Sequence, residues 1–404
     1  MVYCQKIQKN FLKSGKHYFK LKILISPSFL ITKKYLTSLF DNFLINFLKI
    51  KKSHKIELVN GELNHYGEIS KILGSDNVFY LDEIHPIYVK DYCSEYFKNS
   101  ENYQLIESYP SNFNYEKQNY ITLDEVLKKK IKFDFAIFSI KSFNQNFEIV
   151  KYLQSINTKV IMFDKLDDPN IYFKGRNFKI SENYKYNFDL IFKQDIPLWN
   201  NEENVFPIAP IPSIIKNLNE RDIKIKNKSN NFYFVGDYRR NITRKDRFDI
   251  IEFIKKEFDN YFVNLTTDRK VFLSKQRQDD LLFNTKINIS PSGKVWDSYR
   301  HCELVNFGSP ILIPKPNCKT APGEFKDMEN CIIYETQEIN NNFELIDQIN
   351  LKKKIEIVLR SVETRKKIYE NYYNLIVNYH SRYMRSKYIV NTLKKHFKSH
   401  EQII

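Results

Sequence analysis

Glycine is scarce in this sequence, which holds nine glycines, 13 prolines, four methionines and two tryptophans in 404 residues. The common glycine-rich nucleotide motifs are absent: no G-x-G-x-x-G occurs, and a Walker P-loop ending at Gly293 would need glycine where Asn288 stands. Two of the nine glycines, Gly293 and Gly308, nevertheless fall within the 27 residues from 288 to 314. Close backbone approaches or tight turns are therefore expected in that stretch.

Cysteine is also sparse, with an odd total of five. No two cysteines form a C-x-x-C pair, so the sequence predicts neither a disulfide framework nor a zinc site. Free thiols are typical of a reducing compartment, and we expect a cytoplasmic protein without a bound metal. The five are Cys4, Cys93, Cys302, Cys318 and Cys331.

No uninterrupted apolar run approaches the roughly 20 residues that a membrane-spanning helix needs. The most apolar stretch, 26–52, predicts a loop followed by a buried helix. It is interrupted by Lys33, Lys34, Asp41 and Asn42. The first residues do not resemble a secretory signal peptide, which again favours the cytoplasm.

Positive charge exceeds negative charge: 64 Lys and Arg against 48 Asp and Glu give a net charge of +16. A basic protein of this size suits nucleic acid, an anionic membrane face or anionic small molecules. The lysines are spread along the chain without a basic block, as on a solvated surface. A nucleic-acid-binding or DNA-modifying protein is therefore an alternative function, although no specific nucleic acid is expected. Peripheral contact with the anionic cytoplasmic face of a membrane is a further expectation.

Short apolar runs alternate with helical stretches in the first half of the chain. The runs are nearly continuous, as in strands that are buried on both faces of a parallel sheet. The stretches 34–49 and 146–156 carry the periodicity of helices. Strand–helix alternation predicts an α/β fold. The predicted strands are 19–26, 133–140, 158–164 and 188–194.

A proline-rich stretch separates this half from a second α/β pattern. Residues 204–215 hold three prolines and precede a polar run, so we place a domain boundary there. Two such halves would leave a cleft, and ligands of open α/β sheets bind outside the carboxyl ends of the strands. The predicted strands of the second half are 232–238, one within 285–293, 310–314 and 330–335, and its predicted helices are 247–258, 352–379 and 383–397.

A Ser-Pro-Ser-Gly loop follows one of these strands at residues 290–293. Gly293 can bring the backbone close to a ligand or take a positive φ angle. Asp297 or Ser298 can cap the helix that we expect next. The N-terminus of that helix would offer free N–H groups to a phosphate.

Charged residues continue from this loop into the expected helix. Asp297, Arg300 and Glu303 are spaced three apart and would share a helix face. Arg300, with Lys294 near it, could bind a diphosphate, and Glu303 could accept hydrogen bonds from the vicinal hydroxyls of a ribose. Gly308 follows, where the end of a helix favours a left-handed residue. The same spacing also suits a surface ladder of ion pairs, so both interpretations stay open.

The stretch 290–314 resembles the donor-binding segment of group-1-like glycosyltransferases, especially the spore-maturation-type (CgeB-like) subgroup. That segment has a strand, a Ser/Pro/Gly loop and the pattern R-x-x-E-x-x-x-x-G-x-P. Two other segments of the chain are similar to the same family, in the same order. The pattern reads here as Arg300, Glu303, Gly308 and Pro310, and the other segments are "FYFVGDYRRNITR", at 232–244, and "YHSRYMRSKYIVNTL", at 379–393.

The resemblance implies a GT-B fold. In that fold two Rossmann-like α/β domains face each other across a cleft, and a C-terminal helix crosses back to the first domain. The chain would divide into an N-terminal acceptor-side domain, a nucleotide-sugar-binding domain and the returning helix. The expected bounds are 1–215, 216–378 and 379–404.

The same resemblance implies a glycosyltransferase that needs no catalytic metal or cofactor. It would move a sugar from a nucleotide-sugar donor to a hydroxyl of a surface glycan, a lipid-linked oligosaccharide or a protein. A non-catalytic scaffold that binds nucleotide sugars is an alternative. Val295 stands where the wider class often has a second glutamate, so the stereochemical outcome stays open.

The resemblance also assigns candidate residues to the site. It implies that Glu303 binds the ribose and that Gly236 lies in a loop that faces the diphosphate. Cations and a helix dipole would stabilise the departing diphosphate. The candidate donor-binding residues are Gly236, Arg239, Arg240, Ser292, Gly293, Tyr299 and Glu303, and the candidate catalytic residues are Arg300, Lys294, His65 and Asp164.

A catalytic base, which an inverting reaction would need, is expected from the first half of the chain. The candidates are His65, His85, Asp164, Asp167 and Asp168. Three residues near the returning helix are expected to be hinge or packing residues. They are His380, Arg382 and Arg385.

Overall fold

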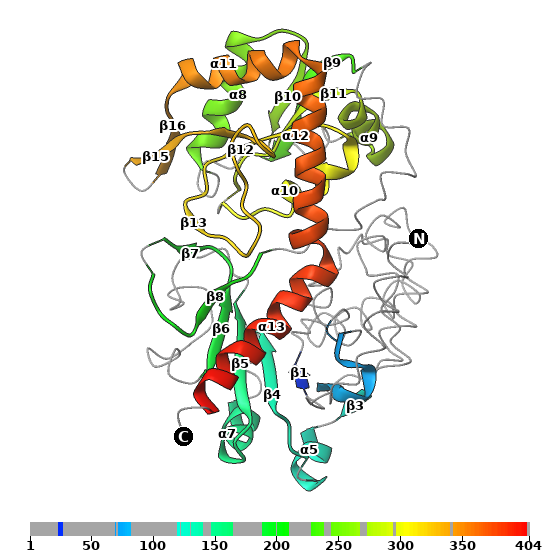
Figure 1. The fold of residues 1–404 in the computed structure, drawn as a ribbon, viewed down its shortest axis with the longest axis vertical. Helices are drawn as coiled ribbons and strands as arrows, with labels where there is room; N and C mark the ends of the chain where they lie inside the picture. The colour runs from blue at the N-terminus through cyan, green and yellow to red at the C-terminus, as the bar shows by residue number, and fades with distance from the viewer. Residues whose placement is uncertain are drawn as a thin grey trace, which may run out of the picture.

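The structure, a computed structural model, contains two large parallel β-sheets and the helices that cover them (Figure 1). The predicted helix 34–49 lies outside the residues that the structure describes. The described residues are 23–26, 69, 72–81, 119–121, 123–129, 131–139, 147–164, 188–198, 200–209, 228–237, 244–266, 273–293, 296–339 and 342–401.

Seven parallel strands form the first sheet. They are β1 (Ile23–Ser26), β2 (Val78–Leu81), β3 (Asn119–Ile121), β4 (Phe135–Ser139), β5 (Lys159–Asp164), β6 (Leu190–Lys193) and β8 (Val205–Pro207). Their order across the sheet is β3-β2-β1-β4-β5-β6-β8. This is the 3-2-1-4-5-6 order of a Rossmann fold with β8 added at one edge. The strands predicted around 19–26, 133–140, 158–164 and 188–194 are confirmed where the structure describes these residues.

Five parallel strands form the second sheet. They are β9 (Asn230–Asp237), β10 (Tyr261–Thr266), β11 (Thr285–Ile289), β12 (Ile311–Pro314) and β14 (Ile332–Tyr334). Their order, β10-β9-β11-β12-β14, is the 2-1-3-4-5 order of a doubly wound sheet. Each strand that the sequence predicted in this half is present.

Helices pack on both faces of the second sheet, because successive side chains of its strands point to opposite faces. Phe232 and Phe234 of β9 share a core with α8 (Lys245–Glu257) and α11 (Gln348–Arg360). The other face packs against three helices and a short 3-10 helix, η7. These are α9 (Lys275–Phe283), α10 (Arg300–Glu303), η7 (Leu304–Phe307) and α12 (Val362–Leu375).

The last helix, α13 (Arg382–Glu401), returns to the first sheet (Figure 1). Its residues Ile389, Val390 and Leu393 are buried in one core cluster with alternate side chains of β4 and β5. The opposite face of that sheet is covered by α7 (Phe147–Ser155). The predicted class, two parallel α/β halves with a C-terminal helix crossing back, is therefore confirmed.

The predicted single helix 352–379 is wrong: the chain forms α11 and α12, and a π-helix then runs to His380. Ser361 between them has an extended backbone, and its Oγ accepts the Thr364 N–H at 3.0 Å. A serine side chain that bonds the backbone in this way begins a new helix instead of continuing the old one. Among the described residues, no helix is both long and apolar enough to cross a membrane.

A buried lysine joins the start of the second half to the ends of two helical segments. Lys228 Nζ donates to Phe283 O at 2.7 Å and to Phe307 O at 3.0 Å, the last residues of α9 and η7. Carbonyls at helix ends lack partners within the helix, so the amine satisfies both. Burial, and then the charge of Arg365, lower the pKa of Lys228 to about 7.

Substitution of Leu393 tests how much the packing of the returning helix stabilises the first half. Its side chain is fully buried, so Leu393→Ala should lower the free energy of unfolding by about 2–5 kcal/mol. Lys394→Ala, at an exposed position of the same helix, should change it by less than about 0.5 kcal/mol. Urea unfolding measures both variants. Equal effects of the two substitutions would contradict the packing of α13 on the sheet.

Candidate functional site

The carboxyl ends of β9 and β11 lie side by side, at the point where the second sheet reverses its strand order. β10, the next strand in the chain, pairs with the other side of β9. The chain therefore leaves β9 and β11 in opposite directions, and such a switch point is where α/β sheets bind ligands. The candidates Gly236, Ser292 and Gly293 belong to these two strand ends or to the loop after β11.

Two guanidinium groups lie near one aromatic ring at this edge. A Cβ atom at Gly236 would lie 2.4 Å from Phe234 Cζ, so the buried ring fills the space that a side chain would need. Arg300 Cζ is 5.0 Å from the centroid of that ring, and Arg247 Cζ is 5.8 Å from it. Both distances are within the range of cation–π contacts. Two guanidinium groups thus lie near the carboxyl end of β9.

Arg247, on the first turn of α8, was not among the residues predicted from the sequence. Its Nε donates to Ser292 O at 2.7 Å, and a Cβ at Gly293 would lie 3.6 Å from its Nη2. Gly293 does not take a positive φ, so that alternative is wrong, and its missing side chain instead leaves room beside Arg247. The available signal was the run of basic residues after Gly236, which continues beyond Arg240 to residue 247.

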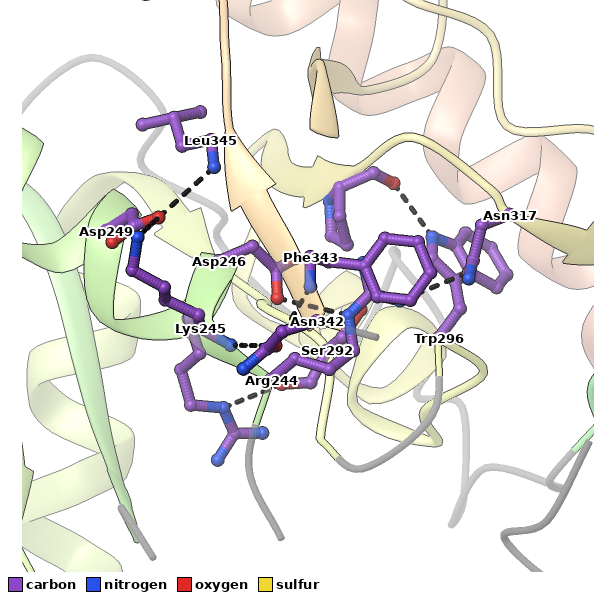
Figure 2. Close-up of polar contacts among 12 residues, drawn as sticks. Arg244, Lys245, Asp246, Asp249, Ser292, Trp296, Asn317, Asn342, Phe343 and Leu345 are labelled. Carbon is purple, nitrogen blue, oxygen red and sulfur yellow. Dashed lines mark hydrogen bonds and ion pairs between the residues drawn. The ribbon is translucent and has the colours of Figure 1, made fainter. Parts of the chain in front are cut away.

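Arg244, at the N-terminal end of α8, is held by structural contacts (Figure 2). Its Nε and Nη2 bond the two carboxylate oxygens of Asp246 at 3.1 and 3.2 Å, and its Nη1 donates to Asn317 Oδ1 at 3.1 Å. Its guanidinium also lies 3.8 Å from the centroid of the Phe343 ring. The Arg244 N–H donates to Gly293 O at 3.2 Å, which fixes the start of α8 against the β11 loop.

A buried histidine holds the segment between β11 and α10. His301 Nε2 lies 2.9 Å from Trp296 O, and a carbonyl can only accept, so Nε2 carries the proton. Ser290 Oγ, 2.8 Å from His301 Nδ1, is then the donor in that pair. Trp296 Nε1 in turn donates to Pro314 O at 2.8 Å. Ser290 and His301 are 0% and 1% exposed and bond each other and Trp296 O, so the polar atoms of this serine–histidine pair are already satisfied by the loop that they support.

The predicted helix after Gly293 is much shorter than expected. α10 spans only Arg300–Glu303 and continues as the 3-10 helix η7. No side chain caps it, although Ser298 Oγ accepts the Arg300 N–H at 3.3 Å. Asp297 precedes the helix, so the prediction that it shares a helix face with Arg300 and Glu303 is wrong. The positive φ predicted at Gly308 is confirmed, at 69°.

The other candidates of this segment have different exposures. Arg300 and Glu303 are partly buried at the two ends of α10, whereas Tyr299 is 55% exposed. Ser292 is fully buried, and within the described part of the chain its Oγ has no hydrogen-bond partner. Such an unpaired buried hydroxyl beside Arg247 could serve a bound polar ligand.

Asp164 lies at the carboxyl end of β5 in the first sheet. Its Oδ2 pairs with Lys193 Nζ at 3.0 Å, and both side chains are almost fully buried. The Asp164 side chain is therefore oriented by a lysine, and its role as a base stays a prediction. The remaining candidates lie outside the described residues: Lys294, Arg239, Arg240, His65, His85, Asp167 and Asp168.

The described ranges contain no candidate metal-binding site. Among those residues, no group of three or more His, Cys, Asp or Glu side chains could hold a metal ion. The described cysteines, Cys302, Cys318 and Cys331, are buried and unpaired by disulfides. Burial raises the pKa of the Cys302 thiol to about 12, so it stays protonated.

Comparison with known proteins gives matches among solved structures alone: no family model and no curated protein matches the sequence. The Anabaena protein HepE in complex with UDP-glucose has a TM-score of 0.48 and 10% identity, over 93% of this chain and 100% of HepE. Sucrose-phosphate synthase from Thermosynechococcus elongatus has a TM-score of 0.48 and 9% identity, over 94% and 100%. The lipopolysaccharide outer core galactosyltransferase WaaB has a TM-score of 0.46 and 10% identity, over 93% and 99%.

His301 should make the stability of this segment depend on pH. Burial lowers its pKa from 6.5 to about 4, so the unfolded chain binds the proton more readily between these pH values. The stability that neutral His301 contributes is complete above pH 6.5 and is lost as pH falls to about 4. Each pKa unit is about 1.4 kcal/mol, so the total is roughly 3 kcal/mol.

Urea unfolding of the wild type and of His301→Gln at pH 7 and pH 4 measures this contribution. Other acidic groups titrate in both proteins, so the difference between them isolates residue 301. The wild type should lose more stability than the variant on acidification. Equal losses would mean that His301 is not held neutral in the folded chain.

Proposed function

We propose that this protein is a glycosyltransferase that binds a nucleotide-sugar donor at the carboxyl ends of β9 and β11. The observation that carries the proposal is the convergence of Arg247 and Arg300 on the Phe234 ring at the switch point of the second sheet. The sequence pattern that resembles group-1-like glycosyltransferases begins at Arg300, one of these two arginines. The nucleic-acid-binding alternative has no comparable cluster to support it in the described residues.

The two arginines suit the leaving group of glycosyl transfer. Negative charge grows on the terminal phosphate as the bond to the sugar breaks, and cations held in place stabilise that charge. Guanidinium groups bind phosphate oxygens in a bidentate manner. Arg247 is oriented by its bond to Ser292 O, so little reorganisation would be needed when the diphosphate arrives.

Glu303 is proposed to bind the ribose. It lies three residues after Arg300 in the same helical turn, and side chains at that spacing are neighbours on the helix surface. A carboxylate can accept hydrogen bonds from two vicinal hydroxyls. The diphosphate at Arg300 and the ribose at Glu303 would then be adjacent, as they are in a nucleotide.

The acceptor is proposed to approach from the first sheet. Asp164 at the end of β5 is the described candidate for a base, and it would first have to part from Lys193. The acceptor class is a hydroxyl of a surface glycan, a lipid-linked oligosaccharide or a protein. Metal independence, the domain bounds 1–215, 216–378 and 379–404, and peripheral membrane contact stay predictions.

Substitution of the two arginines tests the diphosphate site. Thermal shifts with UDP-, GDP-, dTDP- and CMP-sugars first identify the nucleotide, since a ligand of the folded state raises its melting temperature. Arg247→Ala and Arg300→Ala should then each weaken the nucleoside diphosphate about 10- to 100-fold, as loss of a charge-assisted hydrogen bond does. Calorimetry should show little change for the nucleoside, which lacks phosphate.

Arg360→Ala is the matched control, because Arg360 is exposed on α11 and pairs with Glu356. It should leave the affinity unchanged. Sugar transfer or donor hydrolysis by the wild type separates an enzyme from a non-catalytic scaffold. Wild-type affinity in both site variants would remove these arginines from the site and with them the basis of the proposal.

Glu303 is tested with a ribonucleotide and its 2′-deoxy analogue. The wild type should prefer the ribonucleotide by about tenfold, the effect of one hydrogen bond to a charged group. Glu303→Gln should reduce that preference to about twofold or less. Calorimetric titration of both ligands measures it. A preference that survives the substitution would place the ribose elsewhere.

A further inference from the structure

A segment of the first half forms hydrogen bonds with the main chain of Asp297 in the second half. Asp195, two residues after β6, accepts the Asp297 N–H on Oδ1 at 3.0 Å. Gln194 Nε2 donates to Asp297 O at 3.4 Å. Consecutive residues of one half thus bond both polar main-chain groups of one residue in the other half.

The segment that contains Gln194 and Asp195 is itself held in place by contacts with its surroundings. The Asp195 backbone is left-handed, with a φ of 56°, a costly conformation for a residue other than glycine that persists only where its surroundings impose it. The next residues, β7 (Ile196–Pro197), pair antiparallel with β13 (Cys318–Lys319) of the second half. Cys318 Sγ also donates to Asp195 Oδ1 at 3.6 Å. Asp195, which is 6% exposed, is therefore held in a fixed position between the halves.

The returning helix meets the same place. Arg385, 3% exposed, donates from Nη2 to His380 Nδ1, and His380 Nε2 donates to Gly323 O at 2.9 Å. Of the three residues expected to be hinge or packing residues, His380 and Arg385 are buried. Burial, and then the Asp195 charge, raise the pKa of Asp297, while the charge of Arg385 opposes that rise. Two segments of the chain therefore act on Asp297: residues 194 and 195 through hydrogen bonds, and the returning helix through the charge of Arg385.

The position of Arg300 depends on these contacts. Arg300 begins a helix of only four residues, and a helix that short has no stability of its own. The segment before it is anchored at Trp296 by His301 and at Asp297 by Asp195. Loss of the second anchor would free the residues that directly precede Arg300.

We propose that Asp195 is a positioning residue: by accepting the Asp297 N–H, it fixes the segment before α10 and holds Arg300 at the carboxyl end of β9. The effect of Asp195 on donor binding rests on the proposed function, whereas its hydrogen bond with the Asp297 N–H does not. Because Asp195 belongs to the first half, the donor site is complete only when the two halves are docked together.

Hydrogen exchange of the Asp297 amide tests the contact without any ligand. Asp195→Ala should speed that exchange about 5- to 10-fold, the effect of one lost hydrogen bond. Asp195→Asn, whose side-chain carbonyl can still accept, should restore it to within about twofold of the wild type. Asp189→Ala is the matched control: Asp189 Oδ2 accepts the Val160 N–H at 2.7 Å inside the first sheet, so its loss should leave Asp297 unaffected.

Unchanged exchange at Asp297 in Asp195→Ala would overturn the proposal. If that variant does not fold, Asp195→Glu, which keeps the charge but displaces the acceptor, takes its place with the same expectation. For donor binding, the alanine variant should weaken the nucleoside diphosphate about 5- to 10-fold with no change for the nucleoside, and the asparagine variant should restore it.

The two readouts separate this inference from the proposed function. Faster exchange with unchanged diphosphate affinity would overturn the positioning role. If the wild type binds no nucleoside diphosphate, the proposed function is contradicted. Faster exchange in Asp195→Ala would in that case still establish the contact between the halves.

Discussion

The parallel pairing of β9 with β11 is the constraint on which the candidate site depends. Because the two strands run the same way, their carboxyl ends share one edge of the sheet. The helices that follow them lie on opposite faces: α8 packs on one side and α10 on the other. Arg247, on α8, and Arg300, on α10, both lie near the Phe234 ring.

Electrostatics gives this edge its chemical character. Arg244 pairs with Asp246 and serves the fold, and the Nε bond of Arg247 to Ser292 O orients the Arg247 side chain. Both guanidinium groups lie near the same ring, and guanidinium groups bind phosphate oxygens in a bidentate manner. The same edge combines glycine at 236, where a side chain would clash, with a buried serine at 292. These features suit a phosphate group better than a neutral ligand.

The sequence was sufficient for eight of the twelve strands in the two parallel sheets, because buried parallel strands are nearly continuous apolar runs. It did not predict β2, β3, β8 or β10. It was also sufficient for Gly308, since the left-handed end of a helix favours glycine. It was not sufficient for the helix after Gly293: neither Asp297 nor Ser298 caps α10, and the Asp297 main chain is bonded instead to Gln194 and Asp195, about a hundred residues earlier in the chain. Arg247 and Asp195 were missed for the same reason: their roles come from contacts across the fold, and neither stands in a motif.

The two halves are joined by more than the chain that connects them. The Asp195–Asp297 bond, the pairing of β7 with β13 and the packing of α13 all link the first sheet to the second. A crystal structure with a bound nucleoside diphosphate tests the central claim most directly. We predict phosphate oxygens within about 3 Å of guanidinium nitrogens of both Arg247 and Arg300. A diphosphate bound away from the carboxyl ends of β9 and β11, touching neither arginine, would contradict it.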